Sequence, residues 1–176
     1  MPKIIENARG LLIDEAKRQI EQDGYDSVTI RGIARGCNLG LGTFYNYFKS
    51  KDMLIATFLL EDWQKRMEYI TKKHIDEKDP MVVVCTLYDE ISDFIKAYEN
   101  IFTSPSAIKS FNASATGYHK YVRNHVAAPI QNSCVISGLE NPEFLSLFVA
   151  EALITWTTAK KSYDEIASIL SKLFVK

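Results

Sequence analysis

The residues of this chain that could do chemistry gather between Thr29 and Lys51, in the segment TIRGIARGCNLGLGTFYNYFKSK. Three cations, Arg31, Lys49 and Lys51, flank a short stretch that is suited to a helix. When a helix enters the major groove of DNA, cations at its flanks lie close to the phosphates of the duplex. These residues therefore predict a DNA-binding element and not a catalytic centre.

Two short helices joined by a tight turn would position these residues. Apolar residues recur at helical spacing on both sides of the connection Cys37-Asn38-Leu39-Gly40. Asn38 stands where the chain must reverse, and asparagine tolerates left-handed backbone better than other non-glycine residues. The pattern is typical of a helix-turn-helix, whose second helix can lie in the major groove. The apolar positions are Ile30, Ile33 and Ala34, then Leu41, Phe44, Tyr45 and Phe48.

At these residues the chain resembles the tetracycline-repressor (TetR) family, whose pattern is roughly T-x-x-x-I-A-x-x-A-G-V-S-x-G-T-x-Y-x-Y-F-x-S-K. Three positions depart from it, since Cys37 stands for Ala, Asn38 for Gly and Gly40 for Ser. The first two changes keep the local physics. The third removes a side-chain cap from the second helix, although glycine is still an acceptable N-cap. The resemblance covers about the first third of the chain and says little beyond Met53.

The resemblance implies a role for individual residues of this segment. The Asn46 amide would be placed to read adenine, and Leu41 to touch a thymine methyl. Gly42 would let the helix approach the bases closely. The alternative is that Tyr45 and Tyr47 are packing residues and that the lysines are merely solvated. The DNA-contacting set that it implies is Thr29, Arg31, Leu41, Gly42, Thr43, Tyr45, Asn46, Tyr47 and Lys51.

Composition excludes several other classes of protein. The 176 residues are 47% hydrophobic, which favours a folded core over disorder, and the formal net charge is −1. No apolar run of about 18 residues predicts a membrane span, and the N-terminus lacks the apolar run of a secretory signal. The three cysteines are far apart, which suits a reducing cytoplasm. Hydrolase, phosphate-loop and zinc-protease motifs are absent, so we expect no enzyme, cofactor or metal.

The rest of the chain reads as helices, without the alternation that is typical of strands. Proline follows a capping residue at Asp79, Ser104 and Asn141, and each pair predicts a helix start. We therefore expect an all-α protein, with a three-helix DNA-binding domain over residues 1–50 and a larger effector-binding and dimerisation domain over 51–176. The expected helices span about 3–23, 30–36, 41–48, 51–74, 80–102, 105–114, 117–137 with a bend or break at Pro129, 144–160 and 163–174.

The last two helices predict a dimer. Helix 144–160 is apolar on every side, and a helix of this kind must be covered on every side. Because so small a chain has few layers in which to bury both helices, we expect them to be covered by the same helices of a second copy. The alternative is that this helix is the core of a single-chain bundle. The predicted dimer interface comprises Phe144, Phe148, Ala152, Thr155, Ile166, Leu170 and Leu173.

Aromatic residues in the middle of the chain predict a cavity for an apolar or aromatic effector, although most aromatics at helical spacing are ordinary core. The candidate pocket residues are Phe94, Tyr98, Phe102, Phe111, Tyr118, Tyr121 and Trp156. The whole pattern predicts a homodimeric repressor that binds an inverted-repeat operator and is released by a small effector. An activator, or a regulator of the same fold without an effector, is the alternative.

Overall fold

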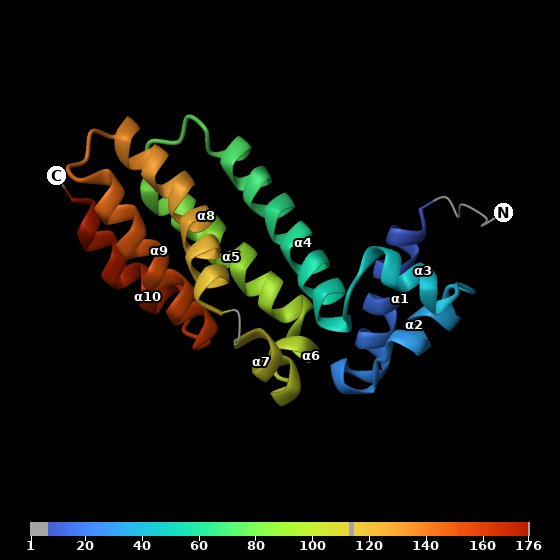
Figure 1. Ribbon diagram of the computed structural model, residues 1–176. Helices are drawn as coiled ribbons and strands as arrows, with labels where there is room; N and C mark the ends of the chain where they lie inside the picture. Colours follow the sequence, from blue (N-terminus) through green and yellow to red (C-terminus); the bar gives the residue numbers. More distant parts are fainter. Residues whose placement is uncertain (1–6, 113–114, 176) are drawn as a thin grey trace. The chain divides into compact units, whose positions relative to one another are not determined.

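The computed structural model describes residues 7–112 and 115–175, and every regular element in these ranges is helical (Figure 1). The prediction of an all-α protein is therefore confirmed. The helices are α1 (Ala8–Asp23), α2 (Ile30–Gly36), α3 (Leu41–Tyr47), α4 (Lys51–Lys73), α5 (Pro80–Ala97), α6 (Glu99–Phe102), α7 (Pro105–Asn112), α8 (Ala115–Ile136), α9 (Pro142–Thr158) and α10 (Tyr163–Leu170), with 3-10 turns at Tyr25–Ser27 and Ser171–Phe174.

Three of the expected helices differ from the structure by more than one or two residues at an end or in continuity. The helix expected over 80–102 is two helices, because α5 ends at Ala97 and α6 begins at Glu99. Helix α8 continues through Pro129, although proline has no N–H to donate to the preceding turn. The last helix ends at Leu170 and finishes as a 3-10 turn. The first residues expected in helix 3–23 lie outside the described part of the chain.

The described chain forms two compact units, called unit 1 (residues 7–62 and 98–112) and unit 2 (residues 63–97 and 115–175). Unit 1 therefore holds the helix-turn-helix together with the first half of α4 and the short helices α6 and α7. Its core is built from one face of α1, the inner faces of α2 and α3, and the start of α4. It is larger than the three-helix domain that the sequence suggested.

Unit 2 is a helical bundle in which α5, α8, α9 and α10 pack against one another (Figure 1). The second half of α4 adds Trp63, Met67 and Ile70 to the same core. Ile166 and Leu170 of α10 are also core residues. Unit 2 thus buries one stripe of its last helix within the chain itself.

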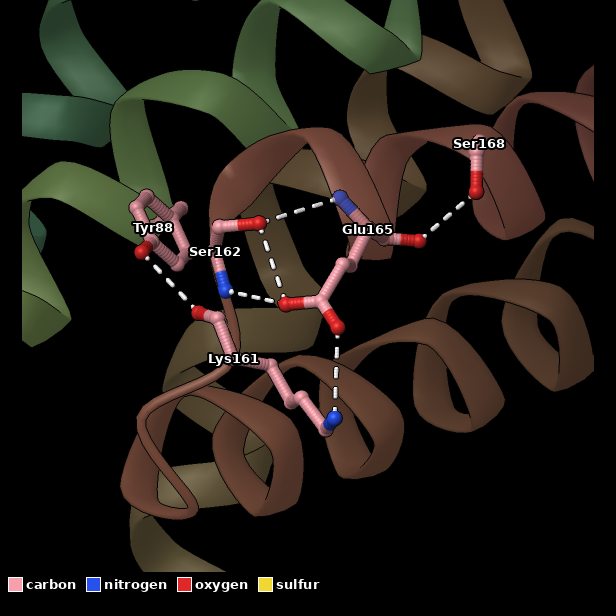
Figure 2. A network of polar contacts seen from close by, with 5 residues as sticks. All are labelled: Tyr88, Lys161, Ser162, Glu165 and Ser168. Atoms are coloured by element: carbon pink, nitrogen blue, oxygen red, sulfur yellow. Dashed lines mark hydrogen bonds and ion pairs between the residues drawn. The ribbon is translucent and has the colours of Figure 1, made fainter.

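The start of α10 is fixed by the capping box that the sequence predicts, and Figure 2 shows its contacts. The Ser162 hydroxyl accepts from the Glu165 amide, and the Ser162 amide donates to the Glu165 carboxylate at 3.0 Å. This backbone donor, followed by Lys161, lowers the pKa of Glu165. The Tyr88 hydroxyl donates to the Lys161 carbonyl at 3.0 Å and so ties α5 to the start of α10.

Replacing Ser162 with alanine is expected to destabilise unit 2 by about 1 kcal/mol, because an N-terminal amide of α10 loses its acceptor. Ser168→Ala is the matched control, since the Ser168 hydroxyl bonds only an already paired helical carbonyl, that of Glu165. Urea unfolding followed by tryptophan fluorescence measures both variants, because Trp63 and Trp156 both lie in unit 2. If both variants lost the same free energy of unfolding, the capping box could not be the cause of the loss.

Candidate nucleic-acid interface

The turn between α2 and α3 has the geometry that the sequence predicts. Asn38 adopts left-handed backbone at φ 56°, and the Leu39 amide closes the turn on the Ala34 carbonyl at 2.8 Å. The Thr29 side chain caps α2 by accepting from the Gly32 amide. Gly40 is the N-cap of α3 and supplies no side-chain bond, as expected. The start of α3 is consequently held by the turn and not by a cap.

Helix α3 is held against the rest of unit 1 by aromatic side chains on one face. Phe44 is fully buried and Phe48 nearly so, and their ring centroids lie 5.9 Å apart. Leu39 of the turn is buried in the same core. The opposite face of α3 is left open to solvent. Its exposed residues are Leu41, Gly42, Tyr45, Asn46 and Tyr47, with Thr43 half-buried between the two faces.

The cations around α3 fall into two groups. Arg31 and Lys49 are exposed, as a phosphate contact requires. Lys51 is half-buried, and its ammonium donates to the Tyr25 carbonyl at 3.0 Å while lying 4.0 Å from the centroid of the Tyr25 ring. Arg35 is exposed one helical turn after Arg31, although sequence reasoning missed it. Its spacing of four residues from Arg31 is the signal that could have revealed it.

Residues of α7 and the loop before it hold the 3-10 turn that leads into α2. The Asp26 carboxylate accepts from the hydroxyls of Ser104, at 3.1 Å, and of Ser106. The Tyr25 hydroxyl donates to Asp52 at the start of α4. Burial, reinforced by this carboxylate, raises the pKa of Tyr25 far above its usual value, so the phenol keeps its proton. These contacts fix the position of α2 within unit 1.

The predicted effector residues pack on the cores of both units or are exposed. Tyr98 and Phe111 pack on the core of unit 1, where they contact Phe58 and Tyr25. Phe94, another of the predicted effector residues, packs instead on the core of unit 2, where its ring centroid lies 5.3 Å from that of Trp63. The remaining residues are Tyr121 and Trp156, which pack on the unit 2 core, and Phe102 and Tyr118, which are exposed.

The predicted dimer residues divide between the surface and the core of unit 2. Phe144 is 75% exposed and Phe148 52% exposed, and Thr155 and Leu173 are also exposed, whereas Ala152 is half-buried. Ile166 and Leu170 are at most 1% exposed, because they cover the chain's own core. These two side chains are therefore unavailable to a second copy. Ile169, which the sequence reasoning did not select, is the exposed apolar residue of that helix.

The described residues offer neither a metal site nor a membrane span. No group of three histidine, cysteine or carboxylate side chains within residues 7–112 and 115–175 could hold a metal ion. In the same ranges no helix is both long enough and apolar enough to cross a bilayer.

Comparison with known proteins places the helix-turn-helix in a family. Residues 12–57 match the model of bacterial regulatory proteins of the tetR family. The chain is 24% identical over 168 residues to the fatty acid metabolism regulator protein of Bacillus subtilis, covering 89% of this chain and 87% of that one. It is 39% identical over 49 residues to the HTH-type transcriptional regulator YuxN of the same organism, which is 28% of this chain and only 17% of that protein.

A solved structure extends the likeness in fold to nearly the whole chain. A transcriptional regulator from Aquifex aeolicus VF5 superposes with a TM-score of 0.62 at 16% identity, over 95% of this chain and 99% of that one. The relatives from Bacillus subtilis are named as regulators, which agrees with the sequence prediction of a transcriptional regulator.

Proposed function

We propose that the chain is a DNA-binding transcriptional regulator of the tetR family, whose model residues 12–57 match, and that it acts as a homodimeric repressor released from an inverted-repeat operator by a small effector. The observation that carries the proposal is the division of α3, whose buried Phe44 and Phe48 leave the opposite face free for the major groove. The proposed place of action is the cytoplasm, where a bacterial regulator meets its DNA.

Each exposed residue of the α3 face has a chemistry that suits one part of the duplex. The Asn46 amide can bond two atoms of an adenine, and the methyl groups of Leu41 and Thr43 suit a thymine methyl. A Cβ built at Gly42 would meet no atom of the chain within 4 Å, so glycine is not needed there for the fold itself. Its absence of a side chain fits a close approach of the helix to the bases.

Phosphate contacts are proposed for the residues around this face. The Thr29 hydroxyl accepts within its own helix, but its hydrogen remains available to a phosphate oxygen. Arg31 and the phenols of Tyr45 and Tyr47 are exposed donors. Lys51 would contribute through the ammonium hydrogens that it does not give to Tyr25. We add Arg35 to this set, since it extends the exposed basic edge that begins at Arg31.

A second copy of the chain is the proposed occupant of the apolar surface on α9 and the end of the chain. Phe144 and Phe148 lie one helical turn apart, so their exposed rings share one face of α9. Ile169 and Leu173 are spaced in the same way at the end of the chain. Two such faces related by a two-fold axis form a self-complementary interface.

The effector is proposed to be a small molecule with an apolar or aromatic body. The relative from Bacillus subtilis is named as a regulator of fatty acid metabolism, which supports a metabolic signal. A regulator of the same fold without an effector is the alternative.

Replacing Asn46 with alanine is expected to weaken operator binding by about ten- to a hundredfold per half-site, which corresponds to about 1–3 kcal/mol for a bidentate base contact. Selection from random duplexes first supplies the operator, and fluorescence anisotropy then compares the variants at fixed salt. Asn124→Ala, an exposed asparagine of α8, is the control. A selection that enriches no sequence, or an unchanged affinity in Asn46→Ala, would contradict base reading by this residue.

A further inference from the structure

Unit 2 carries an open groove of about 380 Å³ that the predicted effector residues do not line. One wall is α4, from Gln64 to Lys72, and the other is α8 around His125. At 1.5 Å per residue, this stretch of α4 is about 12 Å long. Met67 contributes an apolar side chain that is only 3% exposed. The volume and the length of the groove leave room for a slender molecule along α4.

Two residues of the α4 wall donate hydrogen bonds to other groups of the same chain. The Thr71 hydroxyl donates its only hydrogen to the Met67 carbonyl at 2.8 Å, so its lone pairs remain as acceptors. The Gln64 amide nitrogen donates to the Tyr121 hydroxyl at 2.6 Å. The Gln64 carbonyl oxygen is left as an acceptor. The α4 wall is thus richer in acceptors than its residue types alone suggest.

The α8 wall has the same polarity around His125. Its Nδ1 lies 3.0 Å from the Tyr121 carbonyl oxygen, which can only accept, so Nδ1 carries the hydrogen. In the neutral ring, Nε2 is then an acceptor. Pro129 follows His125 by one helical turn and has no N–H, so the His125 carbonyl lacks its helical donor. The Nε2 atom and the backbone carbonyl of His125, a residue that lines the groove, are therefore left as acceptors.

The acceptor-rich groove also carries two charged side chains of opposite sign, Glu68 and Lys72. Glu68, an exposed residue of the α4 wall, contributes a full negative charge. Lys72, one turn further along α4, is the cation among the lining residues. We propose that the groove binds a small organic amine as its ammonium ion, with the ammonium beside Glu68 and His125 and the organic body along α4. Because Lys72 repels a second positive charge, a monoamine is favoured over a diamine.

This site goes beyond the proposed function, because none of the predicted effector residues lines the groove. Its occupancy can be measured without DNA. The 176-residue protein is labelled with ¹³C at the methyl groups of its four methionines, and its spectrum is followed during titration. Met67 reports on the groove, and Met53 in unit 1 is the internal reference. Octylamine is expected to shift the Met67 signal saturably and leave Met53 unchanged. Octan-1-ol is expected to bind about tenfold more weakly, since it lacks the charge-assisted bonds, and octanoate more weakly still.

Glu68→Gln keeps the shape of the side chain and is expected to weaken octylamine binding by about fivefold, the upper range for an exposed ion pair. Glu140→Gln is the matched control, because Glu140 is an exposed acidic residue of unit 2 outside the groove. Octane-1,8-diamine is expected to bind the wild type more weakly than octylamine. Equal binding of octylamine and octan-1-ol would overturn the proposal, and so would equal effects of the two substitutions. A diamine that binds as tightly as octylamine would overturn the placement of the ammonium relative to Lys72.

Discussion

Replacing Phe148 with glutamate is expected to make the purified protein monomeric and to weaken operator binding by at least about a hundredfold, the lower range of the gain from linking two binding modules. Phe148 is 52% exposed on α9, and Phe144 lies beside it one turn away. An aromatic residue near the centre of an interface contributes about 2 kcal/mol or more when it is buried by the partner. The substitution removes this contribution from both copies.

The glutamate also adds an unfavourable charge at the same place. In a two-fold interface each substitution occurs twice, so two carboxylates would be desolvated close to each other. A monomer then presents one α3 helix where the operator offers two half-sites. The folded chain itself should be little affected, because Phe148 lies outside the set of buried residues that form the core of unit 2.

Analytical ultracentrifugation and fluorescence anisotropy measure the two effects on the same samples. Ile75→Glu is the matched control, since Ile75 is 60% exposed in unit 2 but lies in the loop after α4, outside the proposed interface residues. This control should remain dimeric and bind the operator normally. If Phe148→Glu also stays dimeric, the chain dimerises through a surface other than the exposed face of α9.

Sequence reasoning succeeded where the deciding residues lie within a few positions of one another. Thr29 caps α2, Asn38 takes left-handed backbone, and Ser162 forms a capping box, all as predicted. Each of these features is set by bonds that span three to five residues. Local chemistry is sufficient to specify the bonds at these three positions.

Sequence reasoning was weaker where the outcome depends on distant parts of the chain. Helical spacing identifies the stripe that contains Ile166 and Leu170, but it cannot say whether that stripe meets the same chain or a second copy. The structure shows that the same chain covers it. Likewise, nothing in the spacing of Tyr98 and Phe111 shows that α6 and α7 belong to unit 1. The polar contacts of Asp26 with Ser104 and Ser106 join residues nearly 80 positions apart.

Replacing Phe44 with alanine is expected to destabilise unit 1 by about 3–5 kcal/mol, the usual cost of truncating a buried phenylalanine. Phe44 is 0% exposed and packs on Phe48, which is itself buried. The loss has two parts, the apolar area returned to water and the cavity left in a tightly packed core. A loss of this size is comparable to the whole stability of a small domain.

Tyr45→Ala provides the contrast, because Tyr45 is the next residue of α3 but is 54% exposed. It should leave stability within about 0.5 kcal/mol of the wild type, as for a typical surface substitution, while still weakening operator binding.

The tryptophans do not report on unit 1, since both lie in unit 2. Hydrogen exchange of peptides from α1–α3 is therefore the appropriate measurement, with peptides from α9 as the internal reference and protein concentration held fixed. Because adjacent residues then give opposite results, the pair tests directly whether α3 has one face for the core and one for DNA. Similar protection in the two variants would show that Phe44 does not anchor the helix, and the proposed orientation of α3 towards the duplex would lose its basis.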